Sequence, residues 1–256
     1  MTALLASDGL PGRLPPGEVH VWIARLDTIG RHWPDWEQVL SVEERTKSDR
    51  FVRPEDRHRS GASRAILRRL LGHYLSLPPA EVRFTYNRFG KPSLDRTRHS
   101  SQLALSVAHS GECAVFGLRG RGLVGVDLEW LVPGTSIDDL VPEICTARER
   151  QRMEILPEAK RRQAFFRCWT LKEAYLKALG VGLALSPQQV ETELEAWSDA
   201  RERTGHRLGV RGHWTAWGFA HGTDYTVAVV ASGVASLEVR EWNGEASIER
   251  VQSVRT

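Results

Sequence analysis

Residues 103–130 read LALSVAHSGECAVFGLRGRGLVGVDLEW, and this stretch decides the fold class. It contains three apolar runs of strand length separated by glycine-containing turns: Leu103–Ala108, Glu112–Leu118 and Leu123–Trp130. Three short strands joined by tight turns predict a meander. Helical patterns lie on both sides of this meander, so the sequence predicts an α+β fold.

The segment before the meander begins with a strand and continues with helices. Glu18–Leu26 alternates in the manner of a half-buried strand, and a charged amphipathic stretch follows at Trp36–Phe51. Pro54 then opens a long helical pattern, which a pair of prolines stops at positions 78 and 79. Glu81–Tyr86 is predicted as a further strand.

The segment after the meander repeats this order of elements. Helical patterns cover Ala147–Glu154 and Lys160–Leu179, and strand patterns follow near His213–Ala220, Asp224–Ala231 and Leu237–Trp242. Two similar α+β halves are therefore predicted, at residues 18–121 and 122–256, with a turn-rich seam between them. A proline- and glycine-rich leader, residues 1–17, is predicted to be flexible.

Length and composition are those of a folded globular protein. Of 256 residues, 41% are hydrophobic and 26% are charged, which excludes collagen-like, coiled-coil and disordered classes. No apolar run approaches the ~20 residues that cross a bilayer. The N-terminus lacks a basic region ahead of an apolar one, so we expect a cytoplasmic protein without membrane contact. The formal net charge of +3 suits anionic partners such as phosphates or acidic proteins.

Cysteine and lysine are used sparingly. The three cysteines include no C-x-x-C pair, so they are predicted to be reduced core residues with no disulfide or zinc site: Cys113, Cys145 and Cys168. Only five of the 35 cationic residues are lysines: Lys47, Lys91, Lys160, Lys172 and Lys177. A lysine in this arginine-rich chain is therefore worth examining.

Two carboxylates lie two residues apart in the third strand of the meander. Side chains two apart on a strand point to the same face, so Asp127 and Glu129 share one face while Val126 and Leu128 take the other. Adjacent carboxylates repel one another unless a cation lies between them, and their oxygens suit Mg²⁺. By itself the pattern also fits an edge strand with a solvated acidic face.

The long helix of the second half carries another charged pair. Helical spacing puts Phe165, Trp169, Glu173 and Lys177 in one i, i+4 line on a largely apolar face. Partial burial would raise the pKa of Glu173 toward the range of a general base, while a neighbouring lysine or metal would keep it ionised. A solvated surface pair is the alternative for these two residues alone.

Two loops carry groups suited to phosphate oxygens. Lys91 lies in a turn between Gly90 and Pro92, and His109 ends a strand beside Ser110. Either segment could be an ordinary loop. A serine-histidine-aspartate triad is disfavoured, because no G-x-S-x-G elbow precedes the serine.

In combination and in this order, four motifs resemble the 4′-phosphopantetheinyl transferase superfamily, in particular its long, pseudo-dimeric branch typified by the surfactin-type enzymes. The motifs are N-x-x-G-K-P at 87–92, x-H-S-G at 108–111, G-V-D-L-E at 125–129 and W-x-x-K-E-A-x-x-K-A-x-G at 169–180. The resemblance spans roughly residues 40–185. It includes Ser41–Ser60, which is similar to the helix region of that branch that binds coenzyme A.

The resemblance implies two halves related by a pseudo-twofold axis, with coenzyme A in the cleft between them. It implies a monomeric enzyme that moves the phosphopantetheine arm of coenzyme A onto a serine hydroxyl of an apo acyl or peptidyl carrier protein. Adenosine 3′,5′-bisphosphate is the expected second product. A non-catalytic module that binds coenzyme A or a carrier protein is the alternative on the same fold.

The resemblance also implies roles for individual residues. Asp127, Glu129 and Glu173 would hold Mg²⁺, and Glu173 would also act as general base for the serine. Lys177 would neutralise the charge on the leaving phosphate. The phosphates of coenzyme A would be bound by a larger set of cationic residues: Lys47, Arg53, Arg59, Lys91, His109 and Lys177.

Two positions depart from the family pattern, and one further function class is set aside. Ala108 stands where relatives often have serine, and Glu44 stands where relatives may carry a basic residue. Neither departure touches the expected metal ligands. A nucleic-acid-binding protein would gather cations and aromatics on one face, whereas the nine tryptophans here are scattered, so no nucleic-acid partner is expected.

Overall fold

The computed structural model describes residues 14–32, 34–132, 134, 136–192, 204–207, 212–233, 235–242 and 250–254. Most of the predicted leader therefore lies outside the described residues. The helices are α1 (Ile29–His32), α2 (Val42–Asp49), α3 (Pro54–Leu75), α4 (Leu140–Ile144), α5 (Ala147–Glu154) and α6 (Glu158–Leu179). The strands are β1 (Glu18–Arg25), β2 (Phe84–Tyr86), β3 (Pro92–Leu94), β4 (Ala104–Ser110), β5 (Cys113–Arg119), β6 (Val124–Trp130), β7 (Thr204–Arg207), β8 (Trp214–His221), β9 (Tyr225–Ser232), β10 (Ser236–Trp242) and β11 (Arg250–Val254).

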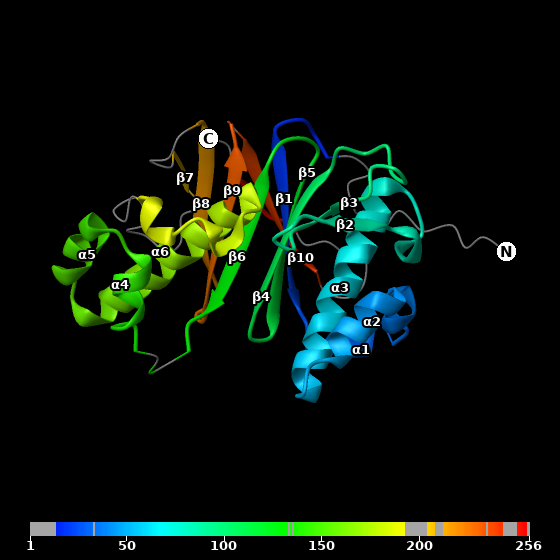
Figure 1. Cartoon of the computed structure of the whole chain (residues 1–256), viewed down its shortest axis with the longest axis horizontal. Coiled ribbons are helices and arrows are strands. Elements are labelled where there is room, and N and C mark those ends of the chain that lie inside the picture. The colour runs from blue at the N-terminus through cyan, green and yellow to red at the C-terminus, as the bar shows by residue number, and fades with distance from the viewer. Residues whose placement is uncertain are drawn as a thin grey trace.

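Two β-sheets pack face to face, and each carries helices on its outer face (Figure 1). The first sheet has the strand order β11-β10-β1-β5-β4, and the second has the order β6-β9-β8-β7. α3 packs on the outer face of the first sheet and α6 on that of the second. This four-layer arrangement of helices and sheets confirms the predicted α+β class.

The alternation of residues along the strands produces these layers. In β1, Val19, Val21 and Ile23 belong to the core between the two sheets, while Trp22 and Ala24 belong to the core under α3. Successive side chains of a strand point to opposite faces, so one strand contributes to two cores. The first sheet is accordingly buried on both faces at its centre.

β6 is not the third strand of a meander, and that prediction is wrong. β4 and β5 form an antiparallel hairpin, but β6 pairs with β9 in the other sheet. Beside β4, the hydroxyl oxygens of Ser106 and Ser110 accept hydrogen bonds from the amides of Val126 and Trp130, each at 3.1 Å. These two serine hydroxyls connect β4 to β6 across the boundary between the sheets, while the backbone of β6 pairs with β9.

The strand predicted at Glu81–Tyr86 is shorter than expected. A 3-10 helix covers Pro79–Glu81, and β2 begins only at Phe84. The reason is the buried guanidinium of Arg68, which donates to the carbonyls of Pro79 and Val82 at 3.1 and 2.9 Å. These carbonyls point at a cation of α3 and so cannot accept from a neighbouring strand.

The last strands return to the first sheet. β10 pairs in parallel with β1, with Val19 opposite Leu237, and β11 pairs with β10. β5 and β6, which lie on either side of residue 121, belong to different sheets. Residues 122–256 nevertheless contribute strands to both sheets, so the two predicted halves are interlocked.

Two further observations concern the whole described part of the chain. All three cysteines are buried with free thiols, as predicted: Cys113, Cys145 and Cys168. Within the described ranges, no helix combines the length and the apolar character needed to cross a membrane.

Candidate active site

α6 packs directly on the backbone of β6 and brings a lysine to a carboxylate. A Cβ atom at Gly125 would lie 1.9 Å from the Ala174 carbonyl oxygen and 2.4 Å from the Ala178 amide nitrogen, so only glycine permits this approach. The short distance between helix and strand places Lys177 Nζ 2.5 Å from Asp127 Oδ1. The two sequence motifs therefore meet in one site.

Asp127 is a buried carboxylate whose hydrogen bonds are incomplete. The residue is 3% exposed, and among the described residues its Oδ2 atom finds no hydrogen-bond partner. Burial raises the pKa of Asp127 to about 7; the Lys177 ammonium opposes this rise, and the carboxylates of Glu129 and Glu173 add to it. A buried, unsatisfied carboxylate beside two others is an arrangement that a cation would stabilise.

Glu129 shares the face of β6 with Asp127, as predicted, but both of its oxygens already accept hydrogen bonds. Trp169 Nε1 of α6 donates to Oε1 at 2.9 Å, and Ser110 Oγ of β4 donates to Oε2 at 3.1 Å. These contacts fix the position of Glu129 between three elements.

Glu173 lies half-buried on α6, one residue from Lys172 and four from Lys177. Burial is the main cause that raises its pKa; the Lys177 ammonium lowers it, and Glu129 raises it further. Among the described residues, two other clusters have potential ligand atoms that all lie within 4.8 Å of one another. Asp127, Glu129 and Glu173 do not form such a cluster. The three carboxylates still fit a divalent cation, since the Oδ2 atom of Asp127 lacks a partner and the three groups repel one another.

Lys91 connects the first half to α6. Its Nζ atom donates to the carbonyls of Val124 at 3.2 Å and Ala178 at 3.0 Å, and the amide of Asn87 donates to the Gly180 carbonyl at 2.6 Å. Free carbonyls at a helix C-terminus attract cations and donors, which explains this docking. Burial lowers the pKa of Lys91 to about 8.

A cavity of about 1060 Å³ opens between α2, α3, β2 and the end of β4. Five basic residues line it, namely Arg45, Lys47, Arg64, Arg68 and Arg83. Its walls also include the aromatic rings of Phe84 and Tyr86, and His109 lies at the β4 side. Asp127, Glu129 and Glu173 are not among the residues that line the cavity, but His109 lies near enough to Lys177 for that cation to act on its pKa. The cavity is large enough for a sizeable anionic ligand with a ring system.

The structure separates the predicted phosphate-binding residues into two groups. Lys47 and His109 line the cavity. The other four, Arg53, Arg59, Lys91 and Lys177, are not among its lining residues. Arg59 forms ion pairs with Asp56 and Glu112. Loss of hydration lowers the pKa of His109, with smaller contributions from the Lys177 and Arg59 cations.

Sequence reasoning missed several residues of this site. Arg68 is 2% exposed and contacts Glu44 Oε2 at 2.6 Å, while Arg64 lies 3.5 Å from the other oxygen of Glu44. Glu44, which stands where relatives may carry a basic residue, closes the capping box of α2 and contacts these two arginines in the cavity wall. Two patterns in the sequence could have indicated this contact. Arg64 and Arg68 are four residues apart in the predicted helix, and Ser41 to Glu44 form an S-x-x-E capping-box pattern.

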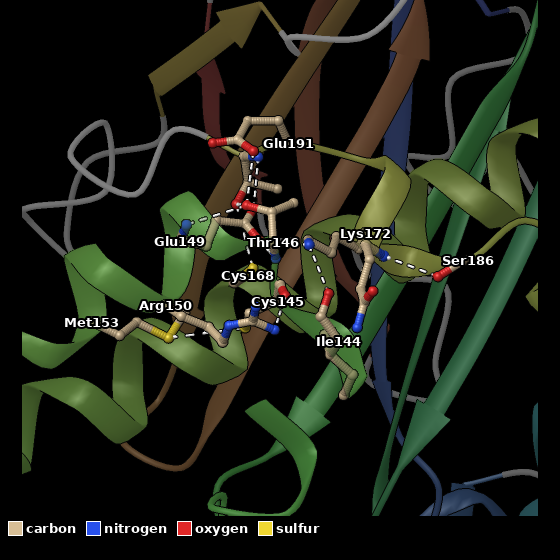
Figure 2. A network of polar contacts seen from close by, with 12 residues as sticks. Ile144, Cys145, Thr146, Glu149, Arg150, Met153, Cys168, Lys172, Ser186 and Glu191 are labelled. Atoms are coloured by element: carbon tan, nitrogen blue, oxygen red, sulfur yellow. Dashed lines mark hydrogen bonds and ion pairs between the residues drawn. The ribbon is translucent and has the colours of Figure 1, made fainter. Parts of the chain in front are cut away.

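A second lysine–carboxylate pair on α6 belongs to a closed network (Figure 2). Lys172 Nζ contacts Glu149 Oε2 at 2.6 Å, and both side chains are fully buried. Lys172 also donates to the Ile144 carbonyl at 2.8 Å. Glu149 closes the capping box of α5 with Thr146 and accepts from the amide and hydroxyl of Thr192. This network fixes α6 on the side opposite the candidate site.

Comparison with known proteins assigns the family. A model of the 4′-phosphopantetheinyl transferase superfamily matches residues 123–230, and a model of a 4′-phosphopantetheinyl transferase N-terminal region matches residues 27–118. The 4′-phosphopantetheinyl transferase HetI of Nostoc sp. is 36% identical over 73% of this chain and 78% of its own length. The chain belongs to the 4′-phosphopantetheinyl transferase superfamily. It is accordingly an enzyme of the transferase class.

Two further relatives fit this assignment. A putative 4′-phosphopantetheinyl transferase of Synechocystis sp. is 39% identical over 61% of this chain and 63% of its own length. A 4′-phosphopantetheinyl transferase of Bacillus subtilis is 27% identical over 57% of this chain and 63% of its own length. The separate match to the N-terminal region lies before the residues that match the superfamily model. It therefore supports in part the resemblance to the long, surfactin-type branch.

Proposed function

We propose that this transferase moves the 4′-phosphopantetheine arm of coenzyme A to a serine hydroxyl of an apo carrier protein. The observation that carries the proposal is the buried Oδ2 atom of Asp127, which among the described residues lacks a partner although Lys177 contacts the other oxygen of this carboxylate. A separate cavity lined by Lys47 and several arginines offers cations for the phosphates. Family membership supplies the reaction class. In the reaction, the serine oxygen forms a bond to phosphorus and the pyrophosphate P–O bond breaks, which releases adenosine 3′,5′-bisphosphate.

The cavity is the proposed binding site for the nucleotide part of coenzyme A. Lys47 and His109 reach the phosphates, and the rings of Phe84 and Tyr86 offer apolar walls. Arg64 lies over both rings, with its guanidinium carbon 5.0 and 5.9 Å from their centres, which leaves a planar cation available for phosphate or base contact. Lys91 serves mainly to dock the N-x-x-G-K-P turn on α6, because its ammonium donates to two carbonyls.

The proposed metal site consists of Asp127 and Glu173, with Glu129 acting through water. Bound Mg²⁺ would reduce the charge repulsion between the pyrophosphate and an incoming nucleophile. Glu173 accepts the serine proton, since burial raises its pKa toward the working range of a general base. Lys177, partly exposed and in contact with Asp127, is the cation that we assign to the charge on the departing phosphate.

Intact-mass analysis tests this function directly. We would incubate the full chain with coenzyme A, Mg²⁺ and a panel of apo acyl and peptidyl carrier domains, and we expect one phosphopantetheine to be added to at least one of them. Chelation with EDTA should abolish transfer, and Mg²⁺ should restore it. Binding of coenzyme A without transfer to any carrier would instead support the non-catalytic alternative.

A matched pair of variants tests the cavity. Lys47→Met and Arg53→Met remove exposed cations from neighbouring segments, but only Lys47 lines the cavity. We expect the KM for coenzyme A to rise in Lys47→Met and to stay unchanged in Arg53→Met. Equal effects of the two changes would contradict the placement of the phosphates in this cavity.

The order of effects at the two strand carboxylates tests the metal ligands. Asp127→Ala should reduce turnover more than Glu129→Ala, because both oxygens of Glu129 are already held by Trp169 and Ser110. The measurement is kcat as a function of Mg²⁺ concentration. The reverse order would mean that Glu129 is the direct ligand.

A further inference from the structure

A serine hydroxyl of the first sheet contacts a carboxylate of the second sheet at the proposed metal site. Ser110 ends β4, and its Oγ atom donates to Glu129 Oε2 of β6 at 3.1 Å. The same oxygen accepts a hydrogen bond from the amide of Trp130, also at 3.1 Å. Because β4 and β6 belong to different sheets, this hydroxyl connects the sheet that carries His109 to the strand that carries the carboxylates.

The two contacts of Ser110 set the direction in which its hydroxyl proton points. A serine hydroxyl has one proton to donate and lone pairs that accept. An amide N–H can only donate, so the amide of Trp130 occupies a lone pair of Ser110 Oγ, and the single proton is directed to Glu129. The donor to Glu129 is therefore itself oriented by the backbone of β6.

The turn that follows Ser110 is anchored to two other elements. Gly111 has a left-handed φ of 55°, and a Cβ atom there would lie 2.8 Å from Tyr225 Oη of β9. The amide of Glu112 donates to that same oxygen at 3.2 Å, and the Glu112 carboxylate pairs with Arg59 of α3. These contacts give Ser110 a well-supported backbone, which a side chain needs if it is to position another group.

Glu129 accepts from a second donor on its other oxygen. Trp169 Nε1 of α6 donates to Oε1 at 2.9 Å, so each oxygen of the carboxylate accepts a hydrogen bond from a different element. An ionised carboxylate has about four acceptor positions, so both oxygens can still contact a further group. Donors on both oxygens resist rotation of the carboxylate plane, and loss of the Ser110 hydroxyl would remove one of these two constraints.

We propose that Ser110 is a positioning residue of the metal site, and that its hydroxyl orients Glu129 toward the divalent cation. This inference rests on the proposed function, in which Glu129 acts on the cation through water. Outer contacts of this kind typically contribute about 10- to 100-fold in metal affinity. Ser110 directly follows His109, which lines the cavity, so the end of β4 serves both the proposed phosphate site and the metal site.

Ser106 provides a matched control on the same strand. Its hydroxyl accepts from the amide of Val126 at 3.1 Å, so it forms the same kind of bridge between β4 and β6. This bridge ends at an amide, whereas that of Ser110 continues to Glu129. Ser106 is 2% exposed and Ser110 is half-buried, so Ser106→Ala should lower the urea midpoint at least as much as Ser110→Ala does.

Titration calorimetry with Mn²⁺ tests the proposal without turnover. The full chain is saturated with coenzyme A, no carrier protein is added, and Asp127→Asn identifies the binding that belongs to this site. Ser110→Ala should weaken Mn²⁺ binding about tenfold. Ser106→Ala should bind Mn²⁺ as the unchanged chain does, and Ser110→Thr, which keeps a hydroxyl, should retain most of the affinity.

Transfer assays add a second readout. In Ser110→Ala, the Mg²⁺ concentration for half-maximal turnover should rise about tenfold, whereas kcat at saturating Mg²⁺ should change less. If Ser110→Ala does not fold, Ser110→Thr and Ser110→Val replace it, because both are branched and only threonine has the hydroxyl.

Two results would overturn the positioning role alone. One is unchanged Mn²⁺ affinity in Ser110→Ala, or equal affinities in Ser110→Thr and Ser110→Val. The other is an equal loss of Mn²⁺ affinity in Ser106→Ala, which would mean that the bridge between the strands acts only on the structure. Absence of Mn²⁺ binding by the unchanged chain is a different result, since it would overturn the proposed metal site and this inference with it.

Discussion

Two lysines five residues apart on α6, Lys172 and Lys177, each contact a carboxylate of another element, and the two pairs differ in how completely their polar atoms are hydrogen-bonded. Lys172 and Glu149 are fully buried, and their contacts include a backbone carbonyl, a capping box and Thr192 (Figure 2). Lys177 is 31% exposed, and its partner Asp127 keeps one buried oxygen without a partner among the described residues. The distances within the two pairs, 2.6 and 2.5 Å, do not distinguish them.

The pKa shifts of the two carboxylates follow this difference. Burial acts to raise the pKa of Glu149, but the Lys172 ammonium and the hydrogen bonds from Thr192 and Thr146 outweigh it, so the pKa is lowered. Asp127 has fewer stabilising contacts, and burial raises its pKa to about 7. A complete pair holds the fold in place, whereas an incomplete one retains the capacity to bind a cation.

The largest effect is expected at Glu173, which lies beside the incomplete pair. Glu173→Gln keeps the side-chain volume but removes the proton acceptor, so kcat should fall by ~10²–10⁴. The free energy of unfolding should change little, because Glu173 is only half-buried. Turnover is measured by intact mass at saturating Mg²⁺, with coenzyme A affinity measured by calorimetry. Near-normal turnover would show that another group deprotonates the serine.

Lys172→Met should be the most damaging change to stability. It leaves Glu149 as a buried charge without its cation, and such a loss costs about 3–5 kcal/mol. The midpoint of urea unfolding measures this cost. The double variant Lys172→Met with Glu149→Gln serves as control and should regain part of the stability, since it removes both charges. A stable Lys172→Met protein with little turnover would mean that the Lys172–Glu149 pair takes part in the reaction and does not serve mainly to hold the fold.

Lys177→Met should reduce turnover strongly and stability only slightly. Turnover should fall by about 10², the effect of removing one electrostatic contact to the reacting groups. The loss of stability should be smaller than in Lys172→Met, because the pKa of Asp127 is already about 7 with Lys177 present and rises further without this cation, so Asp127 can take up a proton near neutrality. Urea unfolding at pH 6 and pH 8 checks this reason, and the loss should be larger at pH 8. Equal losses at the two pH values would mean that Asp127 does not become protonated.

Local patterns predicted most elements because they depend on near neighbours in sequence. Ala147–Glu154 is α5 as predicted, and α6 begins two residues before the predicted Lys160. Strand pairing depends on distant segments, so the sequence placed β6 in a meander although it pairs with β9. The same limit applies to β10, whose partner β1 lies at the other end of the chain.

The candidate site was predictable where its residues share one element. Spacing placed Asp127 with Glu129 on β6, and Glu173 with Lys177 on α6. The contacts of Glu129 with Trp169 and Ser110 join three elements, and no local pattern specifies them. Arg59 was expected to bind phosphate because it is a cation in the right segment, but Asp56 and Glu112 are its partners in the structure.

Lys91 extends the comparison, because its ammonium donates to two backbone carbonyls, those of Val124 and Ala178. Burial lowers its pKa from 10.5 to about 8, whereas the unfolded chain keeps the ordinary value. Between these values the unfolded state binds more protons than the folded state, so stability rises with pH. Below pH 8 the lysine is charged in both states, and its burial costs the folded state the full amount.

The smallest expected effect is therefore a pH dependence that Lys91→Met removes. From pH 8 to pH 10, the unchanged chain should gain stability relative to Lys91→Met, because only the unchanged chain releases a proton on folding in this range. Urea midpoints of both proteins at matched ionic strength measure the difference, and groups common to the two proteins cancel. A difference that stays constant across this range would mean that the ammonium of Lys91 keeps its ordinary pKa. The two carbonyls of Val124 and Ala178 would then offset the cost of burying this charge.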